Sequence, residues 1–302
     1  MTSSDKGADT GAWKASAESE AKAKKNRLLA FLLWGLGIAV EIGAIFGLLL
    51  NKSILEEKAT VDAKGVLTTD NAFPTWAFAL LIGLLVLDAI LVIIGSMLWK
   101  KANELDPASE QQKVKFFIQN QLGAFIPIIA FLPIIILIFL NKDMGKTQKG
   151  IAGAVGIVVA LAAVALGIDF NPASVEKYTA DKQAVIQLLG EDKVYYAGGG
   201  EVYHVCGDVS DLADSTVESG TTADAVAAGK ARLTLKLGSE LEACDRPVPN
   251  NLDEIVAAIR AVQQGESTEQ VLPSPDWSGV ENAPSGGALD SLEDALEDVN
   301  AS

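Results

Sequence analysis

Two acidic residues, Glu41 and Asp88, lie inside long apolar segments of the sequence. Glu41 follows Arg27 by 14 residues, and Asp88 precedes Lys100 by 12 residues. At a helical rise of about 1.5 Å per residue, the two carboxyls lie roughly 21 and 18 Å from the same end of their helices. Two carboxyls at such a depth do not both stay ionised. Three roles fit them: a proton or ion relay, a protonated hydrogen-bonded pair that joins two helices, or contact with a polar group of a partner protein.

A second group of reactive side chains comprises His204, the only histidine, and Cys206 and Cys244, the only cysteines. A single histidine offers no Ser–His–Asp triad or similar nucleophile–base arrangement, so we expect no enzyme activity. Tetrahedral zinc takes four nitrogen or sulfur ligands, and these residues supply at most three. We therefore predict no bound metal and no other cofactor. The cysteines could instead form a disulfide, which would indicate an oxidising compartment.

The two acids belong to a series of four apolar segments in the first half of the chain. Each is long enough, or nearly so, to cross a bilayer core, which takes about 20 apolar residues. We expect membrane-spanning helices at residues 28–50, 76–99, 122–140 and 151–168. No small-residue cleavage site follows the first segment, so we expect a permanent span rather than a cleaved signal peptide.

Lysine and arginine residues beside the spans indicate their orientation. Four cations lie between Lys22 and Arg27, and four lysines lie in the loop at 100–115. Such charges are normally retained in the cytoplasm. We therefore predict a multi-pass protein of the inner cell membrane, with the N-terminus and the C-terminal domain in the cytoplasm. The loop at 141–149 is an exception, since it carries three lysines on the opposite side. A cytoplasmic domain predicts reduced thiols at both cysteines.

Small residues recur at intervals of three or four positions in two of the spans. They are Gly43 and Gly47 in the first span, and Ala152, Gly156, Ala160, Ala163 and Gly167 in the fourth. Such faces let helix backbones approach closely in lipid. They fit packing within the chain's own bundle, or docking on a helix of another protein.

The segment after the spans has the pattern of a small α+β domain. Apolar spacing predicts a helix from Pro172 to about Leu189 and further helices at 221–229 and 252–262. Strand-like runs at 194–197 and 201–205 flank three glycines, which favour the positive φ angles of a hairpin turn. A further strand is expected at 232–237. The predicted fold class is an α-helical membrane bundle of four transmembrane helices plus a small α+β soluble domain with a β-hairpin.

The hairpin and the helix after it resemble the small Ada-like metal-binding fold. The resemblance lies in VYYAGGGEVYHVC, with Tyr203, His204 and Cys206, and in TTADAVAAG, with Ala225, Ala228 and Gly229. That fold carries a pair of cysteines after its last glycine, whereas this chain continues KARLTLKL and reaches Cys244 later. The resemblance therefore implies a degenerate, metal-free relative, in which His204, Cys206 and Cys244 are the remaining candidate ligands.

The C-terminal tail is acidic and contains no lysine or arginine after residue 260. Its composition predicts disorder over much of 265–287. Four apolar residues then share one face of a short helix: Leu289, Leu292, Leu296 and Val299. Two interpretations are open: a tethered docking helix for a basic protein surface, with Trp277 as an upstream anchor, or a transient helix in a solubilising tail.

The charge distribution separates the two halves of the chain and excludes one class of partner. The net charge of −15 divides into about +2 for residues 1–168 and −17 for the rest. An acidic domain repels phosphate backbones, so we expect no nucleic acid as partner. The expected organisation is a polar, partly disordered segment at 1–26, a four-helix transmembrane domain at 27–168, the α+β domain at 169–264 and the acidic tail at 265–302.

Four phrases of the sequence resemble a family of actinobacterial four-span membrane proteins. They are KNRLLAFLLWGLGIAVEIGAIFGLL, LWKKANELDPAS, FFIQNQLGAFIPIIAFLPIIILIFLNKDMGKTQKGIAGAVG and FNPASVEKYTA, within residues 25–254. Within that family, at least one member is similar to an accessory subunit of the respiratory supercomplex that joins the cytochrome bcc reductase to the terminal oxidase. The resemblance implies a non-catalytic accessory subunit without haem or quinone ligands, in contact with the lipid bilayer and other membrane subunits. The alternative is a membrane-tethered metal or redox sensor that acts through Cys206 and Cys244.

Overall fold

The computed structural model describes residues 12–61, 67–267 and 272–284. The chain forms two compact units, which we describe separately. The first, called the bundle, consists of residues 24–101 and 117–170. The second, called the α+β unit, consists of the N-terminal segment up to Ala23, residues 102–116 and the chain from Asn171 onward.

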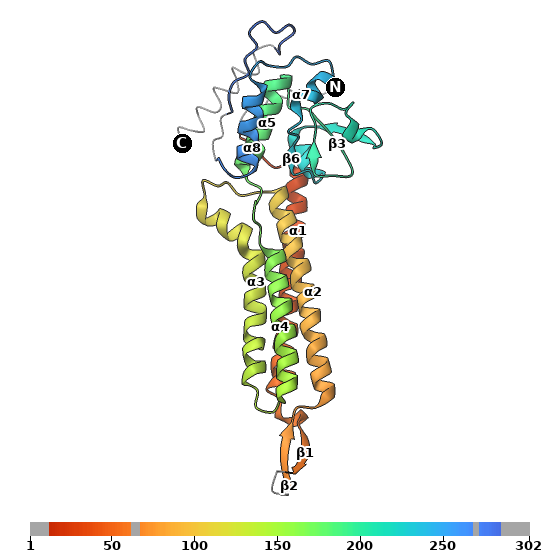
Figure 1. Cartoon of the computed structure of the whole chain (residues 1–302), viewed down its shortest axis with the longest axis vertical. Coiled ribbons are helices and arrows are strands. Elements are labelled where there is room, and N and C mark those ends of the chain that lie inside the picture. Colours follow the sequence, from red (N-terminus) through yellow and green to blue (C-terminus); the bar gives the residue numbers. More distant parts are fainter. Residues whose placement is uncertain (1–11, 62–66, 268–271, 285–302) are drawn as a thin grey trace. The chain divides into compact units, whose positions relative to one another are not determined.

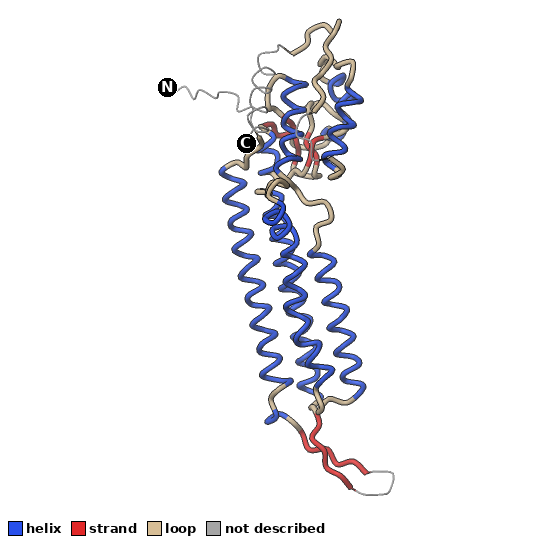
Figure 2. Tube along the Cα trace, turned by 90° about the vertical axis from the view of Figure 1, so that its left-hand side faces the viewer, coloured by secondary structure: helices blue, strands red, loops and turns tan. Residues whose placement is uncertain are grey.

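The bundle contains four helices that are long and apolar enough to cross a membrane, among the described residues. They are α1 (Ala17–Ala44), which continues as a π-helical turn at Ile45–Leu49, α2 (Thr75–Leu105), α3 (Lys113–Leu140) and α4 (Lys146–Gly167). Figures 1 and 2 show them side by side along most of their length. These helices confirm the four predicted apolar spans and fit a multi-pass membrane protein. Helix α1 begins well before its apolar run, where the Ser16 hydroxyl accepts a hydrogen bond from the Ser19 amide at 3.1 Å.

Helices α3 and α4 approach closely at a pair of glycines. A Cβ atom on Gly167 would lie 2.1 Å from the carbonyl oxygen of Gly123, so only glycine fits there. The same carbonyl accepts a hydrogen bond from the Ser96 hydroxyl at 2.8 Å. Pro127, four residues further along α3, has no N–H to donate to this carbonyl. Ser96 therefore satisfies a backbone group that proline leaves free, and α3 continues through Pro127.

One connection of the bundle forms a β-hairpin that the sequence pattern did not predict. Strands β1 (Glu56–Val61) and β2 (Leu67–Ala72) pair antiparallel after a short 3₁₀ turn at Lys52–Ile54. The nearby α3–α4 connection is fixed by Asn141, whose side chain donates to the Leu49 carbonyl at 2.9 Å. Its side-chain oxygen accepts hydrogen bonds from two following amides. This end of the bundle is therefore joined through backbone groups of successive connections.

The α+β unit contains two small two-stranded sheets, the antiparallel pair β3–β5 and the parallel pair β4–β6, which one isolated bridge connects. The strands are β3 (Val194–Ala197), β4 (Val202–Tyr203), β5 (Val217–Gly220) and β6 (Arg232–Leu233). The predicted hairpin between β3 and β4 is present as one antiparallel bridge, in which Tyr195 and His204 exchange two backbone hydrogen bonds of 2.8 Å. The main partner of β3 is β5, which the sequence did not predict. The expected strand at 232–237 is wrong after Leu233: residues 234–236 form no regular element, and helix α7 (Leu237–Ala243) begins at the last residue of the expected strand.

Helix α5 (Val175–Leu189) lies at the centre of the α+β unit, beside α8 (Leu252–Gln263) (Figure 1). The Ser174 hydroxyl caps its N-terminus, and Gly190 ends it with a φ of 77°. Even its polar side chains are buried. The Trp13 amide donates to the Thr179 hydroxyl at 3.0 Å, and the Trp13 ring lies 4.8 Å from that of Tyr178. Segments distant in sequence therefore cover a helix that looks amphipathic in isolation.

Helix α6 (Thr222–Ala227) has the ends that the sequence predicts. The Thr221 hydroxyl accepts from the Asp224 amide at 3.1 Å, and the Asp224 carboxylate accepts from the Thr221 amide at 2.9 Å. This reciprocal pair satisfies two backbone donors at the helix start. Gly229, with a φ of 87°, follows its last turn.

Candidate functional site

A pocket of about 490 Å³ opens in the α+β unit. Its walls come from the glycine turn after β3, from β4, from the 3₁₀ turn Ser210–Leu212 and from residues 232–236. The turn is fastened by the buried Lys230, whose ammonium donates to the carbonyls of Gly199 and Gly200 at 3.0 and 2.9 Å. The glycine turn is therefore held in place as a wall of the pocket.

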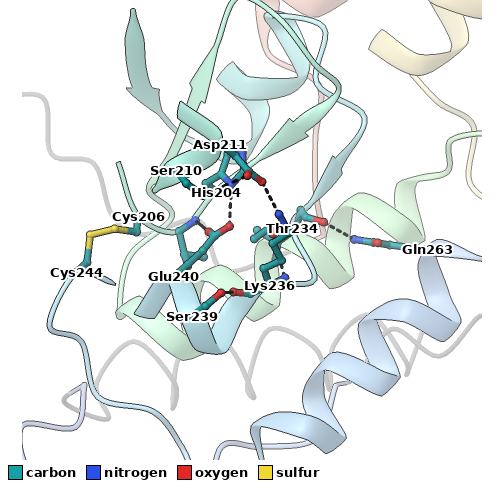
Figure 3. A network of polar contacts seen from close by, with 12 residues as sticks. His204, Cys206, Ser210, Asp211, Thr234, Lys236, Ser239, Glu240, Cys244 and Gln263 are labelled. Carbon is teal, nitrogen blue, oxygen red and sulfur yellow. Dashed lines mark hydrogen bonds and ion pairs between the residues drawn. A yellow bond between two sulfur atoms is a disulfide. The ribbon is translucent and has the colours of Figure 1, made fainter. Parts of the chain in front are cut away.

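His204 lines this pocket and is oriented by a buried carboxylate (Figure 3). Its Nδ1 lies 2.8 Å from Glu240 Oε1, and the other oxygen of Glu240 accepts from the Val205 amide at 3.0 Å. Because a carboxylate only accepts hydrogen bonds, Nδ1 of His204 is the donor in a contact with an ionised Glu240, and Nε2 is left to face other groups. This is the arrangement by which proteins orient an imidazole as a base or a ligand. Sequence reasoning missed Glu240, because it lies 36 positions from His204.

Opposite charges meet at the pocket wall. The Lys236 ammonium lies 2.8 Å from Asp211 Oδ2, and both side chains are substantially exposed (Figure 3). The hydrogen bond and positive charge of Lys236 lower the pKa of Asp211, and Asp211 raises the pKa of Lys236 in return. Arg232 and Glu201 also line the pocket. Its rim can therefore bind charged groups of either sign.

Cys206 and Cys244 form a disulfide, with Cα atoms 5.9 Å apart (Figure 3). The expectation of reduced thiols is therefore wrong, and neither sulfur is left as a thiolate ligand for a metal. Cys206 is fully buried in a small cluster with Ala197 and Leu212. Because both of these neighbours also line the pocket, the disulfide supports the pocket wall from behind. Within the described ranges, no group of three histidine, cysteine, aspartate or glutamate side chains could hold a metal.

The structure buries both intramembrane acids in the interior of the bundle. Glu41 on α1 is 5% exposed and Asp88 on α2 is 2% exposed. One oxygen of Glu41 and both oxygens of Asp88 have no hydrogen-bond partner among the described residues. Burial of this extent argues against direct contact between these carboxyls and a partner protein.

The predicted small-residue faces behave differently in the two helices. In α4, Ala152, Gly156, Ala163 and Gly167 are buried within the bundle. Gly43 on α1 and Gly47 in the π-helical turn that continues it are exposed, and a Cβ atom on either would meet no atom within 4 Å. Gly35 and Ala39 extend the same row at four-residue spacing and are also exposed. The α4 face packs inside the chain, whereas the α1 row faces outward.

The tail residues proposed for docking are only partly described. Trp277 packs against the main core of the α+β unit, and nearby Leu272 is buried there. Asn251 holds the intervening segment, since its side chain bonds the Asp276 amide and the Ser274 carbonyl. The predicted helix residues Leu289, Leu292, Leu296 and Val299 lie outside the described residues. Residues 272–284 thus pack on the rest of the α+β unit. They belong to a stretch for which composition predicts disorder.

Comparisons with known proteins add no relative. No protein-family model matches the chain, and it matches neither a curated protein nor a solved structure.

Proposed function

We propose that this protein is a non-catalytic accessory subunit of a membrane complex, and that the complex is the respiratory cytochrome bcc–oxidase supercomplex. The identity of the complex rests on the resemblance of the four sequence phrases. The accessory role rests on one structural observation, the outward row of Gly35, Ala39, Gly43 and Gly47 on α1 and the π-helical turn that continues it. Rows of small residues let two membrane helices pack backbone to backbone, so this row offers a place for a helix of another subunit.

The test is purification of the tagged protein from native membranes in mild detergent, followed by mass spectrometry and a visible haem spectrum. The proposal expects oxidoreductase subunits in fixed ratio, together with haem absorption bands. A haem-free eluate would reject the respiratory complex as the partner.

A pair of matched variants tests the α1 row itself. Gly43→Ile fills the row with a branched side chain and should reduce co-purification by about tenfold, which corresponds to roughly 1.4 kcal/mol. Gly83→Ile is the control, because Gly83 is likewise exposed, but lies on α2. Equal losses in both variants would remove the α1 row from the proposal.

We place the soluble part in the cytoplasm, because the lysine-rich segments at 22–27 and 100–115 favour that side. The disulfide favours the opposite side, since disulfides persist mainly in oxidising compartments. Labelling of intact cells with a membrane-impermeant amine reagent separates the two placements, with peptide mapping as the readout. Modification of Lys236 before lysis would place this part outside the cell.

A second candidate function, a redox sensor, is favoured by the position of the Cys206–Cys244 disulfide against the pocket wall. Reduction would release the cluster formed with Ala197 and Leu212 and so alter the pocket that contains His204. Intact mass with and without reductant, after trapping of thiols in living cells, tests this function. A disulfide that stays fully formed under both oxidising and reducing growth conditions would reject it.

A further inference from the structure

The apolar parts of the four membrane helices contain two acids and no cation to balance them. These parts are residues 28–50, 76–99, 117–140 and 150–167, and their only ionisable side chains are Glu41 and Asp88. Helices α3 and α4 contribute no titratable or charged group to these segments. Neutralisation of the acids therefore has to come from something other than a side chain of these four segments.

Asp88 points at the face of α1 that carries Glu41. A Cβ atom on Gly37 would lie 2.6 Å from Asp88 Oδ1, so the absence of a side chain on Gly37 makes room for this carboxyl. Gly37 lies four residues before Glu41, and residues at this spacing share one face of a helix. The apolar parts of α1 and α2 thus direct their one acid each into the same region of the interior.

Three of the four carboxyl oxygens in this region are not satisfied by the residues that the structure describes. Glu41 Oε1 and both oxygens of Asp88 have no hydrogen-bond partner among the described residues, although neither residue is more than 5% exposed. Ionised carboxylates without donors or counterions are very unfavourable in a low-dielectric interior. Protonation removes the charge and converts one oxygen of each carboxyl into a donor.

We propose that Glu41 and Asp88 form a proton-binding site inside the bundle, which holds at least one proton at neutral pH. A proton fits better than a metal ion, because calcium and similar hard cations take six or more oxygen ligands. The described residues supply no third acid, histidine or cysteine to such a cluster. The site lies within this chain and requires no particular partner, so it goes beyond the accessory role and is independent of it.

A hydrophobic carbodiimide is a direct probe for such a site. Dicyclohexylcarbodiimide takes up the carboxyl proton on one nitrogen while the carboxylate oxygen bonds its central carbon. The acyl group then moves to the other nitrogen, so the whole reagent is added and nothing leaves. The full-length protein in membranes is treated at several pH values, digested and mapped by mass spectrometry.

The proposal expects addition at Glu41 or Asp88 that falls at least about tenfold as the pH rises, because only the protonated acid reacts. Glu41→Gln and Asp88→Asn should each abolish addition at the substituted position. Glu57→Gln is the matched control, since Glu57 is exposed on β1, and it should leave the intramembrane addition unchanged. Absence of addition at both acids at every pH would overturn the proposal. Protection by sodium or potassium at constant pH would also overturn it, in favour of a metal cation.

Infrared spectroscopy provides a second readout that needs no reagent access. The wild-type protein should show the carbonyl stretch of a protonated carboxyl in an apolar environment, and Glu41→Gln combined with Asp88→Asn should remove it. Each single variant should weaken the band. The single variants therefore keep the test possible if the double variant does not fold. A wild-type spectrum without this band at neutral pH would reject the proton-binding site, whatever the outcome of the pull-down.

Discussion

Buried carboxylates occur in both units of the molecule, and their surroundings differ. In the α+β unit, Asp181 accepts hydrogen bonds from the Tyr203 hydroxyl, the Leu233 amide and the Gln263 side chain, at 2.7–2.9 Å. Glu240 accepts from the Val205 amide and contacts His204. In the bundle, both oxygens of Asp88 lack any partner among the described residues. An acid that collects donors acts as a structural acceptor, whereas Asp88 accepts from no described donor, as the proposed proton-binding site expects.

Among the substitutions that test this comparison, Asp181→Ala should have the largest effect on the free energy of unfolding. The substitution leaves three buried donors without an acceptor, and each such group costs about 1–3 kcal/mol. We expect a loss of at least about 3 kcal/mol in the free energy of unfolding. Thermal unfolding of the full-length protein in detergent measures it.

Asp214→Ala is the control for this loss, because Asp214 is exposed and should change stability by less than about 0.5 kcal/mol. Similar values for the two variants would show that the donors around Asp181 find other acceptors.

A smaller effect is expected for Glu240→Gln. The amide keeps one acceptor oxygen but turns an NH₂ group toward either His204 Nδ1 or the Val205 amide. We expect a loss of about 1–2 kcal/mol and a change in which ring nitrogen of His204 is protonated. Because His204 is the only histidine, the nitrogen resonances of its ring can be assigned without ambiguity. An unchanged tautomer would show that Glu240 does not orient the imidazole.

The protonation of Asp181 should also affect how stability depends on pH. Burial raises the pKa of Asp181 above its ordinary value of 3.8, against the opposing effect of its hydrogen bonds. The folded state therefore holds this proton more tightly than the unfolded state does. Its contribution to stability is present below about pH 4 and is lost as the pH rises through the raised pKa. The difference in unfolding midpoint between wild type and Asp181→Asn, followed against pH, should change in this window and be constant above it.

The smallest effect is expected in the bundle, for Asp88→Asn. Asparagine is nearly isosteric with a protonated aspartic acid, and no described donor loses an acceptor when Asp88 is replaced. We expect a change of less than about 0.5 kcal/mol, whereas Asp181→Asn should cost about 1–3 kcal/mol. The same chemical change thus tests both environments. A loss at Asp88 as large as that at Asp181 would contradict the contrast between the two units.

Local sequence patterns predicted the elements that depend on local physics. The four apolar helices follow from hydrophobic length, and the ends of α6 follow from Thr221 and Gly229. The β3–β5 pairing does not follow in this way, because the exposed residues of β5 show no alternation. The short α7 was not predicted, because the alternation of polar and apolar residues from Arg232 to Leu237 is typical of a strand.

The candidate site was only half visible in the sequence. His204 attracts notice as a lone histidine, but its partner Glu240 is one of many acids in an acidic domain. The cysteine pair was one of several possibilities until the structure brought its Cα atoms within 5.9 Å. Glu41 and Asp88 were identified correctly as buried, since charges in apolar runs are conspicuous. The lack of hydrogen-bond partners at their oxygens could not be predicted, because it depends on where neighbouring helices place their side chains.

The contact between Trp13 and Thr179 has a consequence for biogenesis. The two residues are 166 positions apart, and all four apolar helices lie between them in the chain. When the ribosome has made Trp13, its partners on α5 do not yet exist. The N-terminal segment therefore has to wait until the membrane helices have been synthesised before it can complete the α+β unit. A ribosome-bound chain that stops after α4 should thus leave Trp13 exposed to a soluble quencher, while the finished protein protects it.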